Sequence, residues 1–274
     1  MWHFLFPSGS TPDAPDEMFA DQHAALTEAG FTASICPDSV LAGFKPLRGI
    51  PIGSKVVYRG WMATAEEYAA LVRAIERAGG VPLTSQQEYL TAHHLPNWYP
   101  LLAEFTPETR VFSPDADLVA ELRALDWGSY FVKDFVKSLK SGRGSVVRDP
   151  ADAPAVVSEL REYRGRIEGG ICVRRVEEFM PETEQRYFVL RGVVYAGGAE
   201  PVPDVVRACA ERVRSPFFSV DVVRRRDGVL RVVEVGDGQV SDLVGWSASA
   251  FASLWVSAPD AAPGTSSSGE EPLK

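Results

Sequence analysis

The chain has few cysteines, and its apolar runs are short. Three cysteines, Cys36, Cys172 and Cys209, lie far apart among 274 residues and form no Cys-x-x-Cys pair. A disulfide framework and a zinc module both need closely spaced cysteines, so we expect neither, and the reducing cytoplasm is the expected compartment. No apolar run approaches the roughly 18 residues of a membrane span, and the amino-terminal residues lack the basic stretch of a signal peptide. The sequence therefore predicts a cytoplasmic protein with no membrane partner.

Positive charge and familiar catalytic motifs are also scarce. The 28 lysines and arginines are outnumbered by 37 acidic residues, which gives a formal net charge of −9. This balance excludes a surface coated by nucleic acid, because such a surface needs clustered positive charge. The chain has neither a GxxxxGK[ST] nor a GxGxxG loop, and it has no plausible Ser-His-Asp or Cys-His set. Chemistry that depends on a side-chain nucleophile is therefore not expected.

The distribution of apolar residues, which make up 45% of the chain, predicts two lobes. Over residues 1–108, strand-like and helix-like runs alternate, which is typical of an α/β lobe with a parallel sheet. Over residues 109–257, strands and helices segregate, which favours an α+β lobe with a mainly antiparallel sheet. Residues 258–274 contain hardly any bulky apolar residue and are expected to be a disordered tail.

A predicted hairpin brings two acidic residues together. Asp227-Gly228 separates two β-rich runs and predicts a two-residue type I′ turn, in which Arg226 pairs with Val229. Counting back from that turn sets Asp221 opposite Glu234, with Cβ atoms about 5 Å apart on one face. Two facing carboxylates are tolerated where both face water or where a divalent cation neutralises them. Oxygen ligands favour Mg²⁺ or Mn²⁺ for the second alternative.

Basic residues gather before the hairpin. Five lysines and arginines lie between positions 133 and 148 against one acid, with Gly142 and Gly144 among them, which is compatible with a polyphosphate clamp or with an exposed basic hairpin. Arg175 and Arg186 each alternate with apolar residues along a predicted strand, so each needs an anionic partner. That partner is either an internal acid, such as one of Glu177, Glu178 and Glu184, or the phosphate or carboxylate of a ligand.

The order of these features resembles the nucleotide-binding lobe of the ATP-grasp superfamily. The features are Lys133, the basic glycine-containing segment, RRVEEFM at 174–180, Glu184-x-Arg186, and the Asp221 and Glu234 strands. The chain looks most like the clade named for two arginines and a lysine, which are here Arg175, Arg186 and Lys133. The resemblance covers roughly residues 110–245. It is looser before that, where it rests on YRGWM at 58–62 and HHLPNWYP at 93–100.

The resemblance implies a role for each matched residue. Lys133 and the loop at 140–145 would contact the phosphates of ATP, and the two arginines would stabilise the transferring phosphoryl group. The backbone at 178–180 would bind adenine, and Glu184 would hydrogen-bond the ribose. The implied catalytic residues are Lys133, Arg175 and Arg186; the implied nucleotide-binding residues are Lys133, Lys137, Glu178, Phe179, Met180 and Glu184; and the implied ligands of Mg²⁺ or Mn²⁺ are Asp221, Glu234 and Asp237. The family usually has asparagine two residues after the metal-binding glutamate, where this chain has Gly236, and Asp237 is the expected substitute.

The implied activity is that of an ATP-dependent, ADP-forming ligase. Such an enzyme activates a small-molecule or peptide carboxylate as an acyl phosphate and joins it to an amine. Two alternatives use the same nucleotide site. One is a kinase that phosphorylates a small molecule. The other is a non-catalytic nucleotide-binding module, which Gly236 favours because it replaces the usual asparagine. Residues 59–61 and 93–99 either line an acceptor pocket or pack the lobes together. The identity of the acid and amine, and the oligomeric state, do not follow from the sequence.

Overall fold

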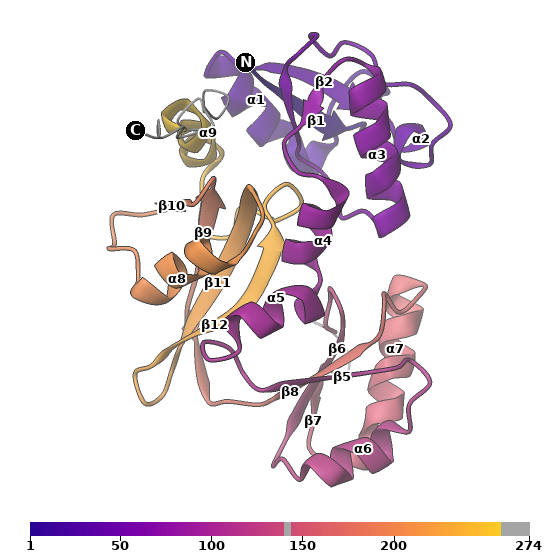
Figure 1. Ribbon diagram of the computed structural model, residues 1–274, viewed down its shortest axis with the longest axis vertical. Coiled ribbons are helices and arrows are strands. Elements are labelled where there is room, and N and C mark those ends of the chain that lie inside the picture. Colours follow the sequence, from indigo (N-terminus) through magenta and orange to yellow (C-terminus); the bar gives the residue numbers. More distant parts are fainter. Residues whose placement is uncertain (140–143, 259–274) are drawn as a thin grey trace, which may run out of the picture.

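The protein is represented by a computed structural model that describes residues 1–139 and 144–258, which form three four-stranded sheets (Figure 1). The first sheet contains β1 (Trp2–Pro7), β2 (Thr32–Cys36), β3 (Lys55–Tyr58) and β4 (Val81–Pro82). The second contains β5 (Thr109–Phe112), β6 (Tyr130–Asp134), β7 (Val146–Val147) and β8 (Ile171–Arg175). The third contains β9 (Phe179–Leu190), β10 (Val193–Ala196), β11 (Phe217–Arg225) and β12 (Leu230–Asp237). Most of the expected phosphate loop and nearly all of the expected disordered tail lie outside the described residues.

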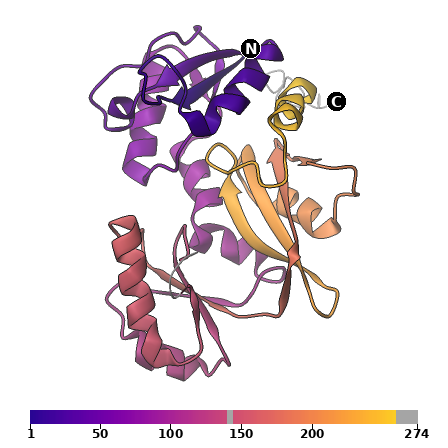
Figure 2. The same cartoon turned by 180° about the vertical axis from the view of Figure 1, so that it is seen from behind.

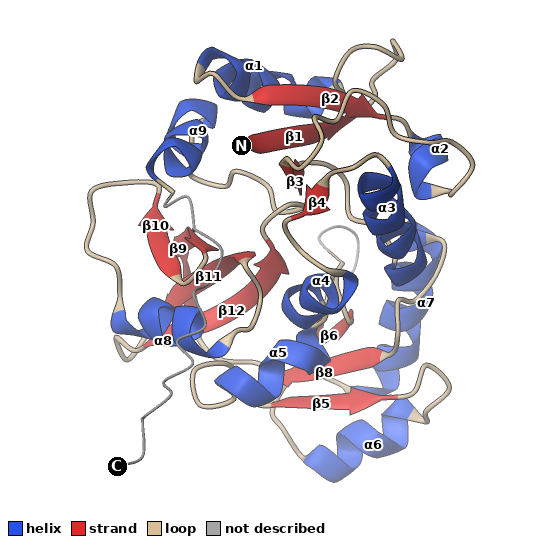
Figure 3. Ribbon diagram, turned by 45° about the horizontal axis from the view of Figure 1, so that its top comes forward, coloured by secondary structure: helices blue, strands red, loops and turns tan. Residues whose placement is uncertain are grey.

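The first sheet is parallel, in the order β2-β1-β3-β4, which confirms the predicted α/β lobe. Parallel neighbours need crossover connections, and helices supply them: α1 (Ala20–Glu28) after the short 3-10 helix η1 (Glu17–Phe19), and α2 (Asp38–Leu41) between β2 and β3. Because side chains alternate along a strand, Phe4 packs in one core with Leu26 of α1, whereas Leu5 packs in another with Leu71 of α3 (Ala65–Arg77). Figure 3 shows α1 and α3 beside the strands of this sheet. The sheet is therefore buried on both faces.

Two capped helices follow from local sequence. The Thr64 side chain accepts from the Glu67 backbone, and the Glu67 side chain accepts in return from the Thr64 backbone, so α3 begins with a capping box. Ser85 begins α4 (Gln86–His93) in the same way. α4 and α5 (Leu95–Leu102) lead from the first lobe to the other two sheets (Figure 1).

The second sheet is antiparallel, in the order β5-β8-β6-β7. The helices α6 (Leu118–Leu125) and α7 (Ala153–Arg164) pack against it, the latter preceded by the 3-10 helix η2 (Pro150–Asp152) that Asp149 caps. Leu122, Leu160 and Val173 meet in the core between them. The sequence predicts one mainly antiparallel sheet over residues 109–257, but β8 pairs with β5 and β6, so this part of the protein contains two antiparallel sheets.

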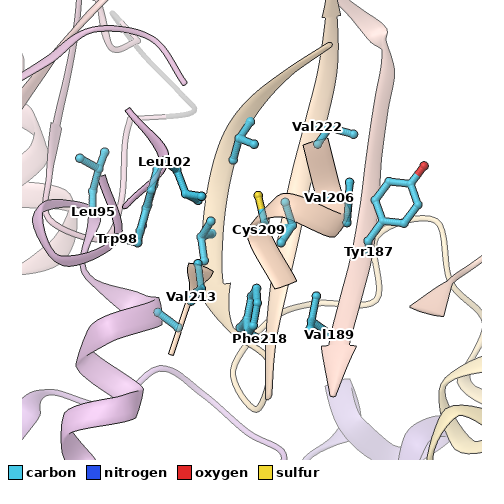
Figure 4. Close-up of a cluster of buried hydrophobic side chains, with 14 of the residues drawn as sticks. Leu95, Trp98, Leu102, Tyr187, Val189, Val206, Cys209, Val213, Phe218 and Val222 are labelled. Atoms are coloured by element: carbon cyan, nitrogen blue, oxygen red, sulfur yellow. The ribbon is translucent and has the colours of Figure 1, made fainter. Parts of the chain in front are cut away.

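The third sheet is antiparallel, in the order β10-β9-β11-β12. Figure 4 shows its core, in which Val206 and Cys209 of α8 (Asp204–Arg212) and Trp98 of α5 approach Phe218 and Val222 of β11. Because α5 belongs to this core, the connection between the lobes is itself packed in place.

The last described helix, α9 (Ala248–Ser257), returns to the first lobe (Figure 2). Trp255 makes edge contacts with Trp2 and Phe4 at centroid distances of 5.2 and 5.1 Å. This helix therefore holds the end of the segment 109–257 against the parallel sheet. Among the described residues, no helix has the length and apolarity needed to cross a membrane.

Candidate functional site

A cavity of about 500 Å³ lies between the second and third sheets. Apolar side chains from both sheets line it, among them Phe131 of β6, Phe179 of β9 and Val223 of β11. The charged residues that line it are Lys133, Arg174, Arg175, Glu177, Glu184 and Glu234. Apolar walls with a few convergent charges suit a ligand that has a flat apolar part and an anionic part.

Lys133 enters this cavity from the middle of the second sheet. It pairs with Cys172 of β8, and only 7% of it is exposed. Burial lowers the pKa of the Lys133 amine, and nearby Glu234 opposes that shift. A buried ammonium of this kind is stabilised by a polyanionic ligand, as expected for a phosphate contact.

Arg174, which is not among the site residues expected from the sequence, is the buried arginine of β8. Its guanidinium donates from Nη1 to the Val233 carbonyl at 2.6 Å and from Nη2 to the Thr106 hydroxyl at 2.5 Å. Burial lowers its pKa to about 10, and Glu234 counteracts the effect. Arg175 also lines the cavity, but it lies at the strand end with its side chain 58% exposed and 4.0 Å from Glu108. Strand alternation could have identified Arg174. Residues 172 and 174 lie on the same face of β8, and Cys172 is the residue that pairs with Lys133.

The expected adenine hinge coincides with the start of β9. Phe179 and Glu184 line the cavity. Glu178, whose carbonyl accepts from the Arg226 amide at 2.9 Å, lines a smaller neighbouring pocket instead. Lys137 and Met180 are not among the described residues that line the cavity: the Lys137 amide is held by the Asp134 carboxylate at 2.6 Å, and the Met180 carbonyl accepts from Thr183 at 2.7 Å.

The hairpin pairs Asp221 with Glu234, as predicted, but by a different route. The turn has three residues rather than two, because Arg225, not Arg226, bonds to Val229, with its amide donating to the Val229 carbonyl at 2.8 Å. With the three-residue turn alone, the pairing of β11 with β12 would shift by one residue from the predicted register. A β-bulge at Asp221/Val222, where Val222 already pairs with Val232, inserts one extra residue in β12 and restores the predicted pair.

Asp221 is bound by Arg186 of the neighbouring strand β9. The Arg186 Nε and Nη2 atoms donate to the two carboxylate oxygens at 2.7 and 2.5 Å, and Nη1 donates to the Asp242 carbonyl at 2.8 Å. Burial lowers the pKa of Arg186, but the bonds and charge of Asp221 outweigh it, so the pKa is raised. Arg186 thus has an internal acid as its partner, although not one of the three glutamates that the sequence suggested.

Asp237 lies apart from the other two expected metal ligands. It is three residues beyond Glu234, so strand alternation directs its side chain to the opposite face, where it is fully buried. Its Oδ1 accepts from the Gln239 backbone at 3.0 Å and from Gln239 Nε2 at 3.1 Å. Burial raises the pKa of Asp237 to about 7. Asp237 therefore belongs to the packing between the lobes.

The remaining pair, Asp221 and Glu234, has the donor chemistry that Mg²⁺ or Mn²⁺ requires. Two carboxylates share a ladder position, and Glu234 reaches the cavity that contains Lys133. Within residues 1–139 and 144–258, no three His, Cys, Asp or Glu side chains are gathered as a complete protein cage. The pair fits a cation that takes its other ligands from substrate phosphates and water.

Comparison with known proteins is consistent with this geometry. Residues 124–256 match an ATP-grasp domain family, the third family of the clade named for two arginines and a lysine. No curated protein matches the chain.

Solved structures share the fold over nearly the whole chain. D-cycloserine synthetase DcsG is similar with a TM-score of 0.60 and 19% identity, covering 93% of this chain and 98% of its own. The RimK domain ATP-grasp protein from Sphaerobacter thermophilus DSM 20745 has a TM-score of 0.62 and 17% identity, with coverages of 92% and 98%. D-alanine–D-alanine ligase from Bacillus anthracis has a TM-score of 0.57 and 11% identity, with 87% of both chains covered. At these identities the likeness establishes the fold.

Proposed function

We propose that the chain is a member of the ATP-grasp superfamily and acts as an ADP-forming ligase that joins a carboxylate to an amine, because residues 124–256 match an ATP-grasp domain family and the chain shares its fold with D-cycloserine synthetase DcsG. The observation that carries the proposal is the cavity between the two antiparallel sheets, in which Lys133 and Arg174 lie together with Glu234. Opposite charges gathered in one partly apolar cavity suit a nucleotide whose phosphates arrive with a divalent cation.

The nucleotide would lie along the cavity from its apolar to its charged part. Phe131 and Phe179 offer apolar surface for adenine, and Glu184 offers a carboxylate for the ribose hydroxyls. Lys133 and Arg174 offer buried positive charge for the phosphates. We therefore add Arg174 to the residues proposed to bind ATP, beside Lys133.

Asp221 and Glu234 would hold Mg²⁺ or Mn²⁺, which neutralises negative charge on the phosphates when bound. Arg186 holds the Asp221 carboxylate by two hydrogen bonds and so lies directly beside the proposed metal position. A guanidinium there stabilises the charge that develops on a transferring phosphoryl group. Arg175, at the cavity rim, is proposed to assist.

The proposed reaction has two steps. A carboxylate oxygen of the first substrate attacks the γ-phosphorus of ATP, and the bond between that phosphorus and the β,γ-bridging oxygen breaks. The products of this step are an acyl phosphate and ADP. The amine then attacks the carbonyl carbon, phosphate leaves, and the nitrogen loses a proton to give an amide. The chain contributes orientation and positive charge rather than a nucleophile, which agrees with the absence of a catalytic triad from the sequence.

One observation favours a second candidate, a nucleotide-binding module without turnover. Gly236 lies on the same face of β12 as Glu234 and offers no side-chain ligand. A Cβ atom there would lie 3.0 Å from the Ser241 hydroxyl and 3.3 Å from the Ser219 hydroxyl. A side chain at position 236 would therefore require these two hydroxyl groups to move by a few tenths of an ångström.

Nucleotide binding is the first test. Isothermal titration of Mg·ATP into the wild-type protein should show binding, and Lys133→Met should weaken it by about tenfold or more because a buried phosphate partner is lost. Lys45→Met, which removes an exposed lysine of the first lobe, is the matched control and should bind as the wild type does. Absence of Mg·ATP binding by folded wild-type protein refutes the proposal.

Turnover is the second test. The protein is incubated with Mg·ATP and panels of carboxylic acids and amines, and ADP, phosphate and new amides are measured together. ADP and phosphate released in step with an amide support the ligase. A phosphorylated product without an amide identifies a kinase, and tight ATP binding without turnover on any panel identifies the binding module.

A further inference from the structure

Arg59, the first residue after β3, is completely buried although it is charged. Six hydrogen bonds satisfy its guanidinium: two go to the side-chain oxygen of Gln22 in α1, and four go to the backbone carbonyls of Gly238, Gln239 and Ser241. The guanidinium also lies 4.6 Å from the ring centroid of Phe251 in α9. A side chain of the first lobe therefore binds the backbone that directly follows β12.

A second arginine holds the same backbone from the other lobe. Arg59 donates from Nη1 and Nη2 to the Ser241 carbonyl, both at 3.0 Å, and Arg186 donates to the next carbonyl, that of Asp242, at 2.8 Å. The Nε and Nη2 atoms of Arg186 each donate one hydrogen bond to Asp221. The successive carbonyls of Ser241 and Asp242 are therefore bound by two different arginines: Arg59 of the first lobe, and Arg186, which also binds the proposed metal ligand Asp221.

The electrostatics of this segment agree with the contacts. Burial lowers the pKa of Arg59 to about 10, so the guanidinium stays charged at neutral pH, and Asp242 is the largest opposing influence. Asp242 also favours the charged form of Arg186. Both guanidinium groups therefore interact with the segment 238–242, through hydrogen bonds to its backbone carbonyls and through the negative charge of Asp242.

We propose that Arg59 is a positioning residue for phosphoryl transfer: by fixing the backbone of residues 238–242, it holds the Asp242 carbonyl where Arg186 needs it, and thereby aims the Arg186 guanidinium at the transferring group. The inference rests on the proposed function. Arg59 is not among the described residues that line the cavity proposed for the nucleotide, and the residues proposed to bind ATP come from other elements. Loss of the hydrogen bonds that Arg59 makes to this backbone should leave nucleotide binding intact. It should weaken only the interaction of Arg186 with the transferring phosphoryl group.

The experiment separates these two interactions and needs no knowledge of the substrates. The affinity for Mg·ADP reports on the nucleotide cavity, and orthovanadate added to the Mg·ADP complex mimics the transferring phosphoryl group and reports on Arg186. Both affinities are measured by titration for wild type, Arg59→Lys, Arg186→Lys and the double variant. Thermal unfolding of each variant verifies that it is folded.

Arg59→Lys is expected to keep its Mg·ADP affinity within about twofold and to lose about tenfold in vanadate affinity, because a lysine cannot bind the successive carbonyls and Gln22 at once. In the Arg186→Lys background the same change should cost nothing more, since Arg59 acts through Arg186. Gln22→Leu, which removes the side-chain acceptor of Arg59 and leaves its carbonyl contacts, should show a smaller loss of the same kind. It is the variant to use if Arg59→Lys does not fold.

Arg191→Lys is the matched control, because Arg191 lies in the turn between β9 and β10 with its guanidinium 4.9 Å from the Trp2 ring centroid. It should bind Mg·ADP and vanadate as the wild type does. The inference is overturned if Arg59→Lys and Gln22→Leu keep wild-type vanadate affinity, if their losses add to that of Arg186→Lys, or if wild type binds Mg·ADP but no vanadate. Failure of the wild type to bind Mg·ADP refutes the proposed function instead.

Discussion

Asp237 offers a direct test of how the two lobes are packed, through the change Asp237→Asn. The carboxyl group is fully buried, and burial raises its pKa from the ordinary 3.8 to about 7, with the Gln239 side chain and backbone and the Arg59 charge opposing the shift. Within the described residues, its Oδ2 atom has no hydrogen-bond partner. The folded protein therefore keeps this group protonated at a pH where the unfolded chain has released the proton.

The sign and size of the effect follow from proton linkage. Because the folded pKa is raised, the contribution to stability is fully present below the unfolded pKa of 3.8 and is lost as the pH rises through about 7. Each pKa unit corresponds to about 1.4 kcal/mol, so the free energy of unfolding should fall by roughly 3 kcal/mol between about pH 5 and about pH 8 on account of Asp237 alone.

The assay is urea denaturation of wild type and Asp237→Asn across this pH range. The asparagine cannot ionise, so the variant should be the more stable protein near pH 8 and lose its advantage near pH 5. His3 and His23, whose pKa values are lowered by burial, act in the opposite direction but are common to both proteins and cancel in the difference. Asp115→Asn, at an exposed position, is the control. A difference between wild type and Asp237→Asn that does not vary with pH would refute the reasoning.

Three further outcomes are expected. Arg174→Met should lower the free energy of unfolding by about 3 kcal/mol, because two buried acceptors lose their donor and Glu234 loses a neighbouring charge, and a loss below about 1 kcal/mol in urea denaturation would contradict this. Thr64→Ala and Ser85→Ala should each cost about 1 kcal/mol by the same assay, since each removes one half of a capping box, and unchanged midpoints would speak against these caps. The three cysteine thiols are buried, and burial raises the pKa of each to about 12, so they should react with a thiol reagent only on unfolding, and rapid labelling of the native protein would contradict that burial.

Local patterns predicted much of the fold correctly. The parallel sheet of the first lobe and the mainly antiparallel strands of residues 109–257 were both predicted, because strand and helix periodicity depends on residues close together in the chain. The hairpin is a more instructive case. Its Asp221–Glu234 pair is confirmed, but through a three-residue turn and a bulge whose effects on the register cancel, and neither was visible as alternation of residue types.

The sequence was a weaker guide where distant segments meet. Of two adjacent arginines, the sequence favoured Arg175, whereas burial singles out Arg174, because the second sheet ends at Arg175 and the third sheet covers Arg174. For Arg59 the sequence left open an acceptor pocket or packing between the lobes, and its hydrogen bonds favour the packing. Asp237 was expected beside Glu234 and faces the other way.

The sequence by itself therefore determined which residues carry charge suited to ATP and a metal ion, and in which order they occur, since residue type and strand periodicity are properties of the chain. Tertiary structure alone decided which of those charges share a cavity and which are buried in the packing. The physical reason is that the cost of burying a charge depends on its partners, and the partners of Arg174, Arg59 and Asp237 come from other elements of the fold. Lys133 of β6 and Glu234 of β12 line the same cavity only because two separate sheets enclose it.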